Sequence, residues 1–153
     1  MKPQADLVKG WLRKADSDVT TASLCIKREQ ALDTACFHAQ QAAEKCPKAY
    51  LTAYAIDFPF VHNLEKLIEL CARRDAAFFN IKTLSQELTP YAVELRYDAE
   101  FWPALETAAQ ALSAAITIRD FVVERLPRRC ARTGGPPYPI GVTGNAEVTP
   151  HTW

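Results

Sequence analysis

Glycine is scarce in this sequence. Only five of its 153 residues are glycine, and Gly10 is the only one before residue 134. Phosphate-binding loops and dinucleotide-binding folds need several closely spaced glycines, so the sequence excludes both. Apolar runs long enough to span a bilayer are also missing, and residues 1–6 lack the apolar core of a signal segment. We therefore expect a cytoplasmic protein with no membrane partner.

An excess of charge of either sign is missing too. Eighteen Lys and Arg residues balance eighteen Asp and Glu residues, so no overall field favours non-specific binding to nucleic acid. The five cysteines are an odd number and form no closely spaced pair, as expected of free thiols in a reducing compartment. Cys36 and His38 point apart on a helix, so we expect no metal site and no cofactor.

Apolar residues recur instead at steps of three and four, which is typical of amphipathic helices. In the first predicted helix, of about twenty residues, they are Leu7, Trp11, Ala15, Val19, Ala22 and Ile26. In the second, from about residue 29 to residue 55, they are Leu32, Ala35, Ala39, Ala42, Cys46, Ala49 and Ala53. Pro47 falls inside this alanine-rich run and should clash with the carbonyl of Ala43. We expect a kink or an interruption there.

Three more helices are predicted: a short one over residues 62–73, one over residues 76–94 that Pro90 can split, and one over residues 103–126. Long helices joined by short loops predict an all-α, up-and-down antiparallel bundle of four main helices plus one shorter helix, within residues 1–127. The tail, residues 128–153, holds four of the five glycines and four of the ten prolines. We expect this tail to be disordered or bound to a partner.

One stretch is more specific than these patterns. Residues 35–45, ACFHAQQAAEK, continue to Lys48-Ala49-Tyr50-Leu51 and closely resemble the signature of the second long helix in HEPN-domain proteins, the "higher eukaryotes and prokaryotes nucleotide-binding" family. Three other features agree in order over about residues 5–126: Trp11 with Ala15 and Asp16, His62 with Leu64 and Leu67, and the pair Arg96-Tyr97. The match departs at Pro47, usually an apolar residue, and at Asp98, where a proline often follows Arg-Tyr.

The resemblance implies a helical bundle that commonly forms a homodimer. It also implies a partner protein, because HEPN domains are often encoded beside or fused to a minimal nucleotidyltransferase domain, sometimes as toxin–antitoxin pairs. Several members are ribonucleases that use an arginine followed after four to six residues by a histidine. Here the nearest arginine upstream of any histidine is Arg28, with nine residues between it and His38. We therefore expect no ribonuclease activity of that kind and lean against an enzyme.

A polar stripe on the second predicted helix is the candidate binding site. It consists of His38, Gln41, Lys45 and Lys48, whose spacings of three, four and three residues put them on one face. Together with Arg96 and Tyr97 they are expected to bind the phosphate and base edge of a nucleotide. Alternatively, the face is only solvated, with His38 hydrogen-bonded inside the bundle. Glu44 is expected to pair with Lys48, four residues along the helix.

Three functions remain open at this stage. The leading hypothesis is a non-catalytic HEPN module that binds a nucleotide, a nucleotidyltransferase-like partner, or both. The second is a divergent ribonuclease that uses Arg96 with His38 or His62 on RNA. The third is a structural adaptor whose alanine face docks another helical protein. The larger aromatic side chains are expected to fill the core; they are Trp11, Phe37, Phe78, Phe79, Tyr91 and Trp102.

Overall fold

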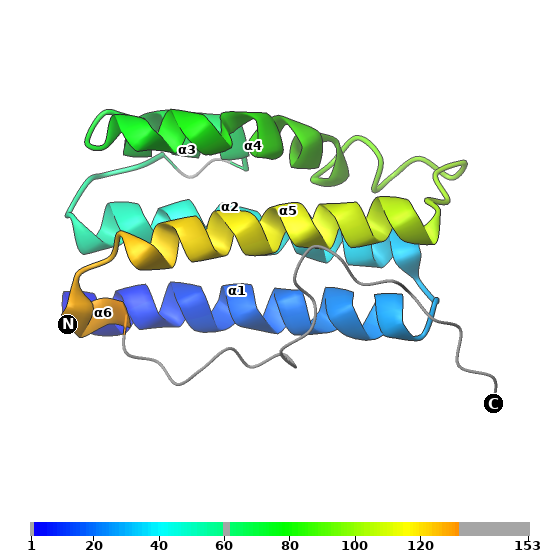
Figure 1. Cartoon of the computed structure of the whole chain (residues 1–153), viewed down its shortest axis with the longest axis horizontal. Helices are drawn as coiled ribbons and strands as arrows, with labels where there is room; N and C mark the ends of the chain where they lie inside the picture. Colours follow the sequence, from blue (N-terminus) through cyan, green and yellow to red (C-terminus); the bar gives the residue numbers. More distant parts are fainter. Residues whose placement is uncertain (1, 60–61, 132–153) are drawn as a thin grey trace.

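The computed structural model describes residues 2–59 and 62–131, and within these ranges the chain is helical without any strand (Figure 1). The two longest helices, α1 (Gln4–Lys27) and α2 (Leu32–Ala53), are joined by a short turn and pack along their whole length. Helix α5 (Leu105–Glu124) packs on α2, and α3 (Leu64–Ala72) and α4 (Lys82–Leu88) complete the bundle. The predicted helical bundle is confirmed.

Helix α2 forms the centre of the bundle. Fourteen of its 22 residues are buried, and its alanine face contacts α1 and α5 of the same chain. Its fully buried alanines are Ala35, Ala39, Ala42, Ala43 and Ala49. Because small side chains let neighbouring helices approach closely, this face holds the bundle together. These five alanines are therefore covered by other helices of the same chain.

Of two expectations about prolines, the interruption at Pro47 is wrong and the split of the fourth helix is confirmed. Helix α2 runs without interruption through Pro47, which is buried, because packing on both sides of α2 keeps it helical despite the lost backbone donor. The expected fourth helix is split into three pieces: the 3-10 helix η1 (Ala76–Ile81), α4, and the 3-10 turn η2 (Thr89–Tyr91), which contains Pro90. A loop over residues 92–104 then leads to α5.

The buried face of α1 agrees with the predicted one at Ala15, Val19 and Ala22 and differs from it near the start of the helix. Leu7 is 45% exposed, whereas Val8 and Leu12 are buried. Asp18 is buried on the same face as Ala15 and Ala22, so a carboxylate enters the contact between α1 and α2. The helical period and the composition do not by themselves reveal a buried carboxylate such as Asp18. It is found only by checking each polar residue that falls on the apolar face.

The chain stays helical beyond Pro127. Residues Arg128–Ala131 form a short helix, α6, and Cys130 is buried against the bundle. The first four residues of the expected tail are therefore part of the fold, and the remainder, residues 132–153, lies outside the described residues. Among the described residues no helix is long and apolar enough to cross a membrane.

Candidate functional site

Two residues of the predicted polar stripe bind one carboxylate of α1. Nδ1 of His38 lies 2.8 Å from Oδ1 of Asp18, and the ammonium of Lys45 donates to Oδ2 of the same carboxylate. Since an ionised carboxylate only accepts hydrogen bonds, the proton in the first contact is on Nδ1 of His38. Both oxygens of Asp18 are thereby satisfied, and Nε2 is the ring nitrogen that His38 retains for another partner.

The next part of the stripe surrounds a second buried carboxylate, that of Glu44. Lys48 donates to its Oε1 at 2.8 Å, as expected from the sequence, while Gln40 donates to Oε2 at 3.1 Å. His62 contacts Oε1 at 2.9 Å from the segment before α3. Burial raises the pKa of Glu44, but the hydrogen bonds and the charge of Lys48 outweigh burial and leave the pKa below its usual value. Glu44 is therefore ionised and paired.

The predicted stripe is thus not presented to solvent as expected. Lys48 is only 9% exposed and lies over the ring of Trp11, at 5.4 Å from its centroid. Gln41 donates to Gln40, and Lys45 to Asp18. Of these three hydrogen bonds, the one from Lys45 joins α2 to α1, whereas those of Gln41 and Lys48 stay within α2. His38 differs, because it also lines a pocket.

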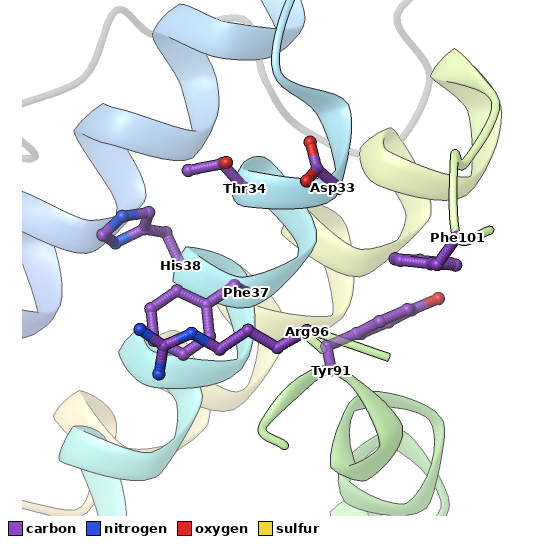
Figure 2. Close-up of a pocket in the computed structure, with 7 residues that line it drawn as sticks. All are labelled: Asp33, Thr34, Phe37, His38, Tyr91, Arg96 and Phe101. Atoms are coloured by element: carbon purple, nitrogen blue, oxygen red, sulfur yellow. The ribbon is translucent and has the colours of Figure 1, made fainter. Parts of the chain in front are cut away.

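The pocket lies at the amino-terminal end of α2 and has a volume of about 220 Å³. Figure 2 shows its two sides: the first two turns of α2 on one side, and the segment from η2 to the loop before α5 on the other. The residues that line it are Asp33, Thr34, Phe37, His38, Tyr91, Arg96 and Phe101. Gln41, Lys45, Lys48 and Tyr97 are not among them. Of the predicted set, the pocket therefore contains only His38 and Arg96.

Aromatic rings form most of the apolar wall. The guanidinium of Arg96 lies over the ring of Phe37, 4.2 Å from its centroid, which leaves its N–H donors directed outward in the plane of the group. On the far wall the rings of Tyr91 and Phe101 are 5.8 Å apart and inclined by 30°. One guanidinium, one imidazole, one carboxylate and three aromatic rings therefore share a small space.

The expectation that the aromatic side chains fill the core holds only in part. Phe78 is fully buried, but Phe79 is 55% exposed and Trp102 is 76% exposed. Phe37 and Tyr91 line the pocket rather than the core. Trp102 directly follows the pocket residue Phe101, and Tyr97, which is 75% exposed, directly follows Arg96. The loop between η2 and α5 therefore carries both pocket residues and exposed rings.

Sequence reasoning missed Asp18, Asp33, Tyr91 and Phe101. Asp33 and Phe101 are 68 positions apart, so no local spacing could pair them. A usable signal existed for the loop, because residues 89–104 combine two prolines with four aromatic rings, an unusual density for a connection between helices. No cluster of three or more metal-binding side chains occurs in the described ranges.

The fold and the pocket define an all-helical protein with a small, aromatic-walled site beside one arginine and one histidine. The model of the HEPN domain matches residues 8–126, and the chain belongs to this family. The crystal structure of an archaeal HEPN homologue superposes with a TM-score of 0.62 at 23% identity, covering 82% of this chain and 98% of that one. That likeness shows the fold alone. A search of curated proteins gives no match.

Proposed function

We propose that this protein is a non-catalytic HEPN module that binds a nucleotide in the pocket at the start of α2. The observation that carries the proposal is that Arg96 and His38 line the same aromatic-walled pocket. A guanidinium binds phosphate through paired N–H donors, and aromatic rings stack on a base. Of the residues expected from the sequence, we keep His38 and Arg96 as direct contacts.

The size of the pocket restricts the ligand. At about 220 Å³ it is smaller than the roughly 300–1,000 Å³ typical of sites for drug-sized ligands. It suits a base with part of its ribose, while the phosphate extends towards Arg96, which is exposed. A dinucleotide cofactor would be too large. Lys45 and Lys48 do not contact the ligand in this proposal, because their charges already balance those of Asp18 and Glu44.

Calorimetric titration with mononucleotides tests this function. The unmutated protein should bind, and at a ligand concentration 100 times the Kd its unfolding free energy should rise by about 2.7 kcal/mol. Arg96→Ala should weaken binding at least tenfold, because it removes the forked donor. Arg13→Ala is the matched control, since Arg13 is exposed on α1 outside the pocket. Equal affinity for both variants, or no binding to the unmutated protein, contradicts the proposal.

The protein partners expected from the resemblance are part of the same proposal. A homodimer, or a complex with a minimal nucleotidyltransferase in a toxin–antitoxin-like pair, needs an exposed apolar surface. The loop before α5 supplies one, because Val93, Tyr97 and Trp102 are 60%, 75% and 76% exposed. Light scattering should give twice the monomer mass for the unmutated protein. The double variant Tyr97→Ala, Trp102→Ala should dissociate, whereas Phe79→Ala, on η1, should not.

A ribonuclease is the second candidate, and one observation favours it. His38 is oriented by Asp18 and shares its pocket with Arg96, although the sequence separates the two by 58 positions. Nε2 of His38 would take the proton of a ribose 2′-hydroxyl, whose oxygen attacks the neighbouring phosphorus while Arg96 stabilises the added charge. The bond from phosphorus to the 5′-oxygen of the next nucleotide breaks, this oxygen takes up a proton from water, and a 2′,3′-cyclic phosphate remains. His62 takes no part, because it contacts Glu44 and is not in the pocket.

Cleavage of bulk RNA separates the two functions. The ribonuclease predicts cleavage that His38→Ala abolishes and His62→Ala leaves unchanged. The non-catalytic module predicts no cleavage above background, while nucleotide binding is retained. Cleavage that survives His38→Ala would remove His38 as the base and would point to a contaminating nuclease.

A further inference from the structure

We infer that the pocket selects guanine, through the carboxylate of Asp33. This assignment rests on the proposed function and adds a specificity to the same site. Asp33 lies in the first turn of α2 and is the only acidic residue that lines the pocket.

The carboxylate of Asp33 is available for a ligand. It is half-buried, and none of the described side chains donates a hydrogen bond to it. Its place in the first turn of α2 puts it at a helix end that carries partial positive charge. An ionised carboxylate has no donor and can only accept hydrogen bonds. Asp33 therefore selects a ligand edge that presents donors.

Guanine is the base whose edge fits such an acceptor. It presents two neighbouring donors, N1–H and the N2 amino group, which the two oxygens of one carboxylate can accept together. Adenine and cytosine present one amino group beside a ring nitrogen that is itself an acceptor, and uracil presents one N–H between two carbonyls. Each of these three bases would place an acceptor against the carboxylate. Sites that bind a donor pair reject analogues that lack part of it.

The other walls agree with this orientation. Tyr91 and Phe101, whose rings are 5.8 Å apart and inclined by 30° to each other, place aromatic surface beside the site, against which a purine can pack. Figure 2 shows Arg96 and Tyr91 reaching into the site from the segment opposite the α2 turn that carries Asp33. A base that meets Asp33 at one edge can therefore direct its phosphate to Arg96. The like charges of carboxylate and phosphate are kept apart.

Calorimetric titration with GMP, IMP, AMP and XMP on the full chain tests the assignment. The unmutated protein should bind GMP about tenfold more tightly than IMP, which lacks the N2 amino group, and more tightly still than AMP. Asp33→Asn should weaken the binding of GMP at least tenfold and strengthen the binding of XMP. The reason is that an amide offers one acceptor to the N1–H of xanthine and one donor to its O2. Asp6→Asn, in the first turn of α1, is the matched control.

The outcomes separate the assignment from the proposed function. If GMP and AMP bind equally, Asp33→Asn changes neither and Arg96→Ala weakens both, the nucleotide site stands and guanine selection is overturned. If no nucleotide binds the unmutated protein, both fail. If Asp33→Asn weakens every nucleotide to the same degree, Asp33 acts on the helix end rather than on the base, which also overturns the assignment. Thermal unfolding of each variant checks that it is folded.

Discussion

The Nδ1 nitrogen of His38 lies 2.8 Å from Oδ1 of Asp18, and this contact links the interior of the bundle to its pocket. Asp18 is held in turn by Lys45, so the orientation of one pocket residue depends on an ion pair between α1 and α2. The bundle thereby fixes the ring of His38 before any ligand arrives.

Removing this carboxylate should destabilise the protein and misplace His38. Asp18→Ala leaves the half-buried charge of Lys45 without its partner, and we expect a loss of about 2 kcal/mol in unfolding free energy, measured by urea denaturation. Glu94→Ala, which removes an exposed carboxylate, should change stability by less than about 0.5 kcal/mol. Equal stability of the two variants would show that the Asp18 pair contributes nothing to the fold.

The ionisation of Glu44 should make the unfolding free energy depend on pH in the acid range. Because the pKa of this carboxyl is lower in the folded protein than its usual value, its contribution is complete at neutral pH. It is lost as the pH falls from about 4.5 through the lowered pKa. Glu44→Gln should cost about 3 kcal/mol at pH 7, since Lys48 stays buried without its counter-charge.

Urea denaturation at pH 7 and at successively lower pH values checks this. The unmutated protein should lose more unfolding free energy across the acid range than Glu44→Gln does, so that the two curves converge. Glu65→Gln, on the first turn of α3, serves as the control and should follow the unmutated protein. Parallel curves for Glu44→Gln and the unmutated protein would show that Glu44 is not the responsible group.

The turn before the pocket carries backbone strain. Ala31, which precedes α2, has a φ of 51°, in the left-handed region, which costs a residue with a Cβ atom about 1–2 kcal/mol. Ala31→Gly should therefore raise the unfolding free energy by about 0.5 kcal/mol after the added freedom of the unfolded chain is subtracted. Ala109→Gly, inside α5, should lower it by about 1 kcal/mol. Both unfolding free energies are measured by chemical denaturation. If the two variants are destabilised to the same extent, the backbone at Ala31 is not strained.

The fold could be predicted from the sequence because it depends on local repeats. The alanine period of α2 and the pair Glu44–Lys48 lie within one helix, and both were predicted as they occur. The site could be predicted only in part. His38 and Arg96 were identified, but their pocket depends on how η2 and the following loop fold back over the start of α2. A polar face at helical spacing does not reveal that Asp18 neutralises it from another helix.

An amide-resolved NMR titration with a mononucleotide tests the central claim most directly. If the pocket is the binding site, signals of Thr34, Phe37, His38, Arg96 and Phe101 should shift together and saturate with one affinity, while those of Lys48 and Thr52 on the second half of α2 stay in place. Shifts centred on Lys45 and Lys48, or no shifts at millimolar nucleotide, would contradict a nucleotide site formed by Arg96 and His38.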